Sequence, residues 1–197
     1  MVYEQGLEII IGPMFSGKTT LLLSKLNTLH NIGLKVLYIN HSIDKRSDQV
    51  FSTHCVITQN QQFGFDQIKA EMLMDIPITY VNKYDIIGID EAQFFDKSII
   101  DFVKYYVEMS KKYIIVAGLD GTYERKRFGN ILDLIPLSDI VTKQYSYCKD
   151  CIDNKNKIKK GLFTYKYKHT NNSVIEVGDK DMYKTLCREC YVKNQHN

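Results

Sequence analysis

Short apolar, β-branched runs alternate with helical patterns along the first 145 residues of the chain. Strands are predicted at residues 7–11, 35–39, 78–81, 85–89 and 113–117. Helices are predicted at residues 18–29, around 65–73 and at 97–111. Because the strand runs are apolar on both faces and are separated by helices, the pattern predicts an α/β domain with a buried parallel sheet.

The pattern changes after Val141, where the chain becomes polar and rich in lysine and tyrosine, with no sustained helical period. Two cysteine pairs bracket this stretch. We therefore predict two parts, an α/β domain over residues 1–141 and a small metal-stapled subdomain over residues 142–197.

The composition is that of a globular protein with a real core, at 44% hydrophobic and 25% charged residues. A net charge of +3 is too small to indicate nucleic acid or a membrane as the main partner. Neither a secretory signal nor an apolar run of about 20 residues is apparent. We therefore expect a cytoplasmic protein whose cysteines, five in all, serve mainly as metal ligands rather than as disulfides, with Cys55 left over as a packed thiol.

A glycine-rich loop separates the first predicted strand from the first predicted helix and fits the pattern G-x-x-x-x-G-K-[ST]. In such loops backbone N–H groups surround phosphate oxygens, and the positive end of the helix dipole favours an anion. Lys18 is expected to reach the terminal phosphates, and Thr19 to offer its hydroxyl to Mg²⁺. The candidate ATP and phosphate ligands in the loop are Gly12, Pro13, Met14, Phe15, Ser16, Gly17, Lys18, Thr19 and Thr20.

Two carboxylates, Asp90 and Glu91, follow the predicted strand at 85–89. Ligands of open α/β sheets bind at this end of the strands, so Asp90 is a candidate for holding Mg²⁺. Glu91 is then a candidate general base. The pair alone leaves two reactions open: activation of water gives an ATPase, and activation of a substrate hydroxyl gives a kinase.

The cysteines form two C-x₂-C pairs, Cys148 with Cys151 and Cys187 with Cys190. Four thiolates suit tetrahedral Zn²⁺, and a closed shell of four leaves no position for water, so we expect a structural zinc site. The alternatives are buried free thiols or a redox pair. If zinc is bound, a zinc ribbon that binds nucleic acid is an alternative function, although no basic stripe interleaved with aromatics supports it.

Several motifs in order resemble the type II thymidine kinases, cellular and viral. These are residues 12–20 (GPMFSGKTT), 44–46 (DKR), 51–54 (FSTH), 90–95 (DEAQFF), 118–123 (GLDGTY) and 125–129 (RKRFG). The two cysteine pairs stand where that family has its zinc ligands, and the resemblance covers nearly the whole chain.

The resemblance implies that Glu91 is the general base on the 5′-hydroxyl of thymidine, with ATP as phosphate donor. It further implies that Asp44 and Asp90 serve Mg²⁺ together with Thr19, and that Arg46 faces phosphate. The implied thymidine-binding residues are Met14, Phe94, Leu119, Tyr123, Phe128, Thr164, Val174, Val177, Gly178 and Tyr183. Members of the family are typically homotetramers and are often inhibited by thymidine triphosphate, so the resemblance implies both.

Three features depart from the family pattern. The segment between Cys151 and Tyr183 is longer than in short relatives. Lys166 stands where many relatives have an arginine, and lysine cannot form the same two-pronged hydrogen bond. Gly178 is followed by Asp179 where a second glycine is common. These departures concern the loop that covers the nucleoside.

Overall fold

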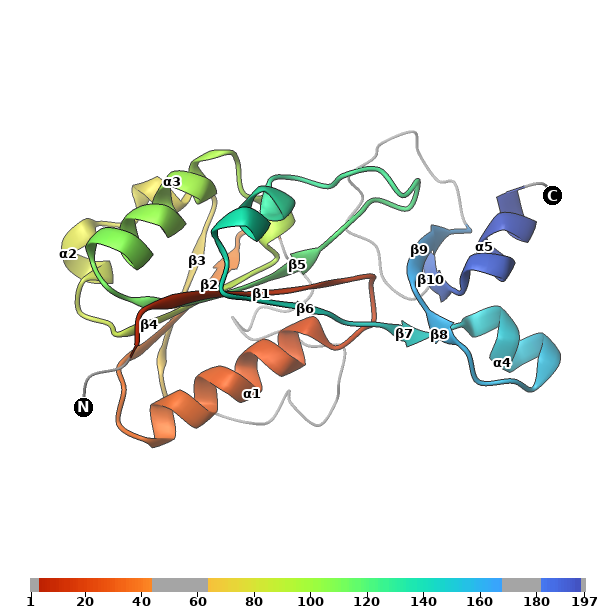
Figure 1. Cartoon of the computed structure of the whole chain (residues 1–197), viewed down its shortest axis with the longest axis horizontal. Coiled ribbons are helices and arrows are strands. Elements are labelled where there is room, and N and C mark those ends of the chain that lie inside the picture. Colours follow the sequence, from red (N-terminus) through yellow and green to blue (C-terminus); the bar gives the residue numbers. More distant parts are fainter. Residues whose placement is uncertain (1–3, 44–63, 168–181, 196–197) are drawn as a thin grey trace.

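The computed structural model describes residues 4–43, 64–167 and 182–195. A larger unit built on a six-stranded sheet occupies one end of the molecule, and a smaller unit that carries the cysteines occupies the other (Figure 1). Among the described helices, none combines the length and the apolar character needed to span a bilayer.

All neighbouring strands of the six-stranded sheet are parallel, in the order β3-β2-β4-β5-β1-β6. The strands are β1 (Gly6–Gly12), β2 (Val36–His41), β3 (Asp66–Ala70), β4 (Ile86–Asp90), β5 (Tyr113–Leu119) and β6 (Ile140–Lys143). The carboxyl ends of parallel strands share one edge of the sheet. The loop after β1 and the acidic pair after β4 therefore lie on either side of the end of β5.

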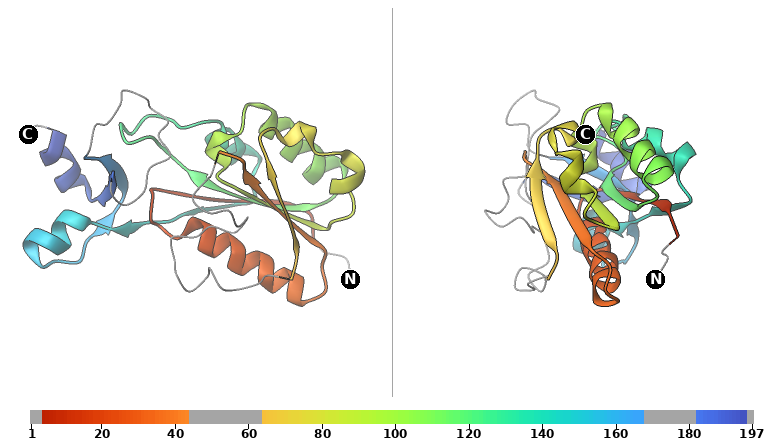
Figure 2. Two further views of the ribbon diagram at one scale, coloured as in Figure 1. Left: turned by 180° about the vertical axis from the view of Figure 1, so that it is seen from behind. Right: turned by 90° about the vertical axis from the view of Figure 1, so that its left-hand side faces the viewer.

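Helices cover both faces of this sheet (Figures 1 and 2). On one face α1 (Lys18–Asn31) packs Leu22 and Leu26 against Ile10 of β1. The other face carries α2 (Ile78–Val81) and α3 (Ser98–Lys104). The short helices are η2 (Leu73–Asp75), η3 (Ala92–Phe94), η4 (Tyr105–Met109, a π-helix) and η5 (Ile131–Leu137). Burial on both faces explains why the inner strands β1, β2, β4 and β5 are mostly apolar, whereas the edge strand β3 is polar and largely exposed.

The smaller unit consists of two antiparallel strand pairs and two helices. β7 (Ser146–Tyr147) pairs with β8 (Lys160–Gly161), and β9 (Phe163–Lys166) pairs with β10 (Tyr183–Leu186). The helices are α4 (Lys149–Lys155) and α5 (Arg188–Gln195). The edge strand β6 leads from the sheet into this unit and runs across the division expected after residue 141.

The predicted strands at 7–11, 35–39, 85–89 and 113–117 and the predicted helices at 18–29 and 97–111 are confirmed. Two predictions are wrong. Residues 65–73 form β3 and η2 rather than a helix, because pairing with β2 overrides the helical preference of this polar segment. Residues 78–81 form α2 rather than a strand, because Pro77 fixes the entry to a helical turn despite the β-branched residues that follow.

Gly88 in the middle of β4 allows α1 to approach the sheet. A Cβ atom at this position would lie 2.4 Å from Leu26 Cδ1, and the Leu26 side chain is fully buried. We expect Gly88→Ala to lower the free energy of unfolding by about 1–3 kcal/mol through overpacking. Chemical denaturation measures this loss. The double variant Gly88→Ala/Leu26→Ala should lose less stability than the sum of the two single losses, because shortening Leu26 removes the clash; strictly additive losses would contradict the contact.

Candidate active site

The phosphate loop lies between β1 and α1, as predicted. Gly12 ends β1, and Lys18, Thr19 and Thr20 form the first turn of α1. The Pro13 carbonyl accepts two hydrogen bonds within the loop, from Ser16 Oγ at 2.8 Å and from Lys18 Nζ at 2.7 Å. The Lys18 ammonium is thus held over the loop, where a bound phosphate would meet it.

Two glycines of the loop are required by the backbone. Gly17 is the N-cap of α1 and has φ of 79°, a left-handed conformation that glycine adopts without strain. A Cβ atom on Gly12 would lie 2.6 Å from the Gln144 carbonyl oxygen, so only glycine fits where the loop passes the segment after β6.

Asp90 lies at the end of β4 with its side chain almost fully buried. Its carboxylate accepts hydrogen bonds from the Thr19 hydroxyl, from the Tyr38 hydroxyl at 3.0 Å and from the Glu91 N–H at 2.8 Å. The structure therefore brings together two of the three predicted Mg²⁺ ligands, Thr19 and Asp90. A hydroxyl beside a carboxylate at a phosphate loop is a donor set that suits Mg²⁺.

Burial, together with the smaller effect of the neighbouring Glu91 charge, raises the pKa of Asp90 to about 6. The hydrogen bonds from Thr19, the Glu91 N–H and Tyr38 oppose this shift. A bound cation would favour the ionised carboxylate.

Glu91 has a left-handed backbone, with φ of 51° and ψ of 37°. This conformation is uncommon for a residue with a side chain and is often found at functional sites. Gln93 Nε2 donates a hydrogen bond of 2.6 Å to Glu91 Oε2, and Gln93 Oε1 accepts one of 2.9 Å from the Leu119 N–H. Gln93 therefore fixes the carboxylate of Glu91 relative to the end of β5.

The predicted nucleoside-binding aromatics lie in two groups. Phe94 packs edge-on against Phe128, with ring centroids 5.5 Å apart, and also contacts His41. In the second group the Lys166 ammonium lies 5.4 Å from the centre of the Tyr123 ring, and Lys166 pairs with Tyr183 across the β9–β10 hairpin. Thr164 contacts the loop directly, since its Oγ1 accepts a 3.0 Å hydrogen bond from the Met14 N–H.

Five predicted site residues lie outside the described part of the chain. They are Asp44, Arg46, Val174, Val177 and Gly178.

Several residues that shape the site were missed by the sequence analysis. Tyr38 sits within an apolar strand, and nothing in the sequence distinguishes its hydroxyl from a packed ring. Gln93 belongs to the motif at residues 90–95, but the sequence does not indicate that its amide orients Glu91. Thr185 lies two residues before the metal-ligand candidate Cys187, and no motif includes it. Its hydroxyl donates a hydrogen bond to the Met14 carbonyl.

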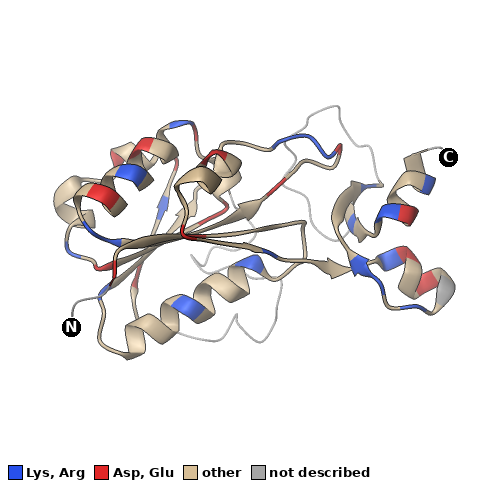
Figure 3. Ribbon diagram, viewed as in Figure 1, with Lys and Arg blue, Asp and Glu red and all other residues tan. Residues whose placement is uncertain are grey.

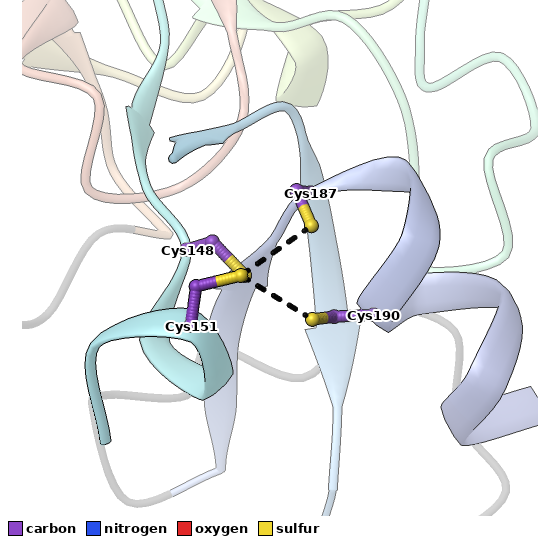
Figure 4. A group of neighbouring side chains, drawn as sticks. All are labelled: Cys148, Cys151, Cys187 and Cys190. Atoms are coloured by element: carbon purple, nitrogen blue, oxygen red, sulfur yellow. Dashed lines mark hydrogen bonds between the residues drawn. The ribbon is translucent and has the colours of Figure 1, made fainter. Parts of the chain in front are cut away.

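The four cysteines converge from the starts of α4 and α5 (Figure 4). All are buried and free, and their Sγ atoms lie within 4.8 Å of one another. Cys151 Sγ is 3.8 Å from Cys187 Sγ and 3.6 Å from Cys190 Sγ. Sulfurs around tetrahedral Zn²⁺, with Zn–S bonds of about 2.3 Å, are roughly 3.8 Å apart, so the cluster fits zinc. The separations are far longer than a disulfide bond.

Charged residues of both signs alternate along α3, α4 and α5 (Figure 3).

The parallel sheet, the phosphate loop after β1 and the acidic pair at the end of β4 define a phosphate-loop nucleotide-binding protein, and the cysteine cluster adds a site suited to zinc. The sequence profile of the family "Thymidine kinase" matches residues 5–191. The chain belongs to the thymidine kinase family and is a kinase.

Poxviral thymidine kinases are similar over nearly their whole length. That of variola virus is 37% identical over 188 residues, which cover 94% of this chain and 96% of the relative. That of Amsacta moorei entomopoxvirus is 38% identical, covering 94% and 97%. That of Choristoneura fumiferana entomopoxvirus is 38% identical, covering 96% and 97%. The flagellar accessory protein FlaH of Methanocaldococcus jannaschii, at 14% identity, aligns with 74% of this chain and 73% of its own at a TM-score of 0.49, too weak a likeness to carry an argument.

The raised pKa of Asp90 has a consequence for stability. Unfolding lowers this pKa to about 3.8, so between about pH 4 and 6 only the folded state holds the proton. Stability of the magnesium-free protein should therefore fall as pH rises through this window, by up to about 3 kcal/mol from this group. Denaturant titrations of wild type and Asp90→Asn at several pH values measure the difference. An identical pH dependence in the two proteins would contradict the shift.

Removing one cysteine should open the cluster. We expect Cys148→Ser to lose most of its bound zinc and to melt several degrees below wild type, because the metal ties the starts of α4 and α5 together. Metal analysis and thermal unfolding test this. Cys55→Ser, which changes a cysteine outside the two pairs, is the matched control and should keep its zinc. Unchanged zinc content in Cys148→Ser would exclude the site.

Proposed function

We propose that the protein transfers the γ-phosphate of ATP to the 5′-hydroxyl of thymidine, giving ADP and thymidine monophosphate. The observation that carries the proposal is the arrangement of Glu91 beside Asp90 and Thr19 at the phosphate loop, in a chain of this family. The same arrangement supports ATP as donor.

The proposed chemistry is an in-line displacement. Glu91 accepts the proton of the 5′-hydroxyl as that oxygen bonds to the γ-phosphorus, and the bond from phosphorus to the β,γ-bridging oxygen breaks. The two electrons of that bond leave with ADP. Lys18 and the N–H groups of the loop offset the negative charge that spreads over the transferred group.

Mg²⁺ would be held by Thr19 and Asp90, with Asp44 proposed as a further ligand, and would neutralise phosphate charge. Tyr38 supports this arrangement by fixing one Asp90 oxygen. Gln93 supports the base by orienting Glu91 with its amide N–H. Arg46 is proposed to face phosphate.

Thymine binding is proposed to use apolar and aromatic surfaces, because its methyl group favours a dry environment. The proposed surface comprises Met14, Phe94, Leu119, Tyr123, Phe128, Thr164 and Tyr183, with Val174, Val177 and Gly178 from the covering loop. Contacts of Phe94 with Phe128 and of Thr164 with Met14 support it.

The remaining proposals concern the wider protein. Residues 1–141 are proposed as the ATP-binding domain and 142–197 as the zinc-binding subdomain that covers the nucleoside. A homotetramer, inhibition by thymidine triphosphate and a cytoplasmic location follow from the family resemblance, and thiol ligands suit a reducing compartment. Neither an ATPase nor a nucleic-acid-binding module is favoured.

A phosphoryl-transfer assay tests the reaction. Labelled Mg²⁺-ATP is offered in parallel with each natural nucleoside and with none. Label should appear on thymidine and deoxyuridine only, because a hydroxyl held near Glu91 reacts and free water does not. Phosphate release at the same rate in every tube would identify an ATPase instead.

Glu91→Gln is the variant that separates chemistry from binding. It keeps the size of the side chain and removes its ability to accept the proton, so kcat should fall about 10²–10⁴-fold while ATP affinity stays close to wild type. An unchanged kcat would remove Glu91 from the role of base.

A further inference from the structure

The β9–β10 hairpin has two faces with different contacts. Thr164 pairs directly with Thr185 across the two strands, so both side chains lie on the same face. Residues one position away point to the opposite face. There Phe163 and Tyr165 pack edge-on against Tyr191 of α5, with ring centroids 5.5 and 5.7 Å apart.

The threonine face forms hydrogen bonds with the backbone of one residue of the phosphate loop, Met14. Thr164 Oγ1 accepts a hydrogen bond from the Met14 N–H at 3.0 Å. Thr185 Oγ1 donates one to the Met14 carbonyl at 3.0 Å. The two paired threonines thus satisfy both backbone polar groups of one loop residue.

Burial makes these two bonds effective. Thr164 and Thr185 are only 6% and 3% exposed, so water has little access to replace the hydroxyls. The bonds also come from outside the loop, whereas Ser16 and Lys18 hold the neighbouring Pro13 carbonyl from within it. Thr164 and Thr185 tie the loop at Met14 to the smaller unit.

The hairpin is itself held firmly by the cysteine unit. Thr185 is followed after one residue by Cys187, and the Lys184 ammonium pairs with the Asp150 carboxylate of α4 at 2.7 Å. The Tyr165 hydroxyl donates a 3.0 Å hydrogen bond to the Asn194 carbonyl of α5. A hairpin backed on its far face in this way can fix the position of the loop on its near face.

We infer that Thr164 and Thr185 are positioning residues that hold the backbone of Met14, and with it the phosphate loop, in the geometry that binds Mg²⁺-ATP. Because Met14 is also a proposed contact of thymine, the same two hydrogen bonds, here called the threonine clamp, set the position of the Met14 side chain. This second consequence depends on the proposed function, and the first does not.

The test removes each hydroxyl without changing side-chain shape, in Thr164→Val, Thr185→Val and the double variant. Equilibrium titration with a fluorescent ATP analogue and Mg²⁺ should give a Kd raised about fivefold in each single variant and more in the double. The KM for thymidine should rise as well, with a smaller change in kcat. Thr164→Ser and Thr185→Ser keep the hydroxyl that valine removes, so their Kd and KM should equal the wild-type values.

Thr28→Val is the matched control, because it removes a hydroxyl that bonds the Ser24 carbonyl on the exposed side of α1. It should bind the ATP analogue as wild type does. Zinc content of the valine variants is measured alongside and should be unchanged. If the double variant does not fold, the two single variants carry the test.

Valine variants that melt earlier yet bind the ATP analogue with wild-type Kd would overturn the inference, since the threonines would then only stabilise the fold. Failure of the serine variants to restore binding would overturn it as well. If wild type proved inactive on thymidine, the proposed function would fail. The Kd values for the ATP analogue would still show whether the threonine clamp positions the loop.

Discussion

The site depends on one constraint, the parallel pairing of β1 and β4 with the two sides of β5. Ile10 is level with Ala117 on one side, and on the other Ile89 is level with Val116, so Asp90 ends β4 just where β1 approaches the phosphate loop. The Thr19 hydroxyl reaches Asp90 only because of this register. A slip of one residue would turn the carboxylate toward the opposite face of the sheet. Apolar burial of the sheet on both faces resists such a slip.

The same edge of the sheet carries the unfavourable features of the fold. Asp90 is buried with a raised pKa, and Glu91 adopts a left-handed backbone. Gln93 is packed so closely that Cβ atoms at Gly118 and Gly129 would lie 2.7 and 2.1 Å from its oxygens. The buried carboxylate and the left-handed backbone each cost stability, and the close packing of Gln93 helps to fix the Glu91 carboxylate in place. Such costs concentrated at one place are typical of a reactive site rather than of a structural edge.

The sequence was most informative where a local pattern has one structural solution. The phosphate loop, the apolar strands and the two cysteine pairs each specify their own geometry, and the structure brings Thr19 to Asp90 and the four sulfurs together. Residues 65–73 and 78–81 were misjudged because pairing with β2 and the turn after Pro77 outweigh local preference. Tyr38, Gln93 and Thr185 could not be found, since their roles come from partners that only the folded chain brings near.

The threonine contacts with Met14 span 150 and 171 positions of the chain. During synthesis the phosphate loop emerges early, together with β1 and α1, yet the Thr164 bond cannot form until β9 has been made, and the Thr185 bond must wait for β10. The loop is therefore among the first segments to leave the ribosome and among the last to be completed. Contacts over such distances in sequence also slow folding, because loop closure must come before they form. A nascent chain that ends before β10 carries the complete loop motif without the Thr185 bond that holds it.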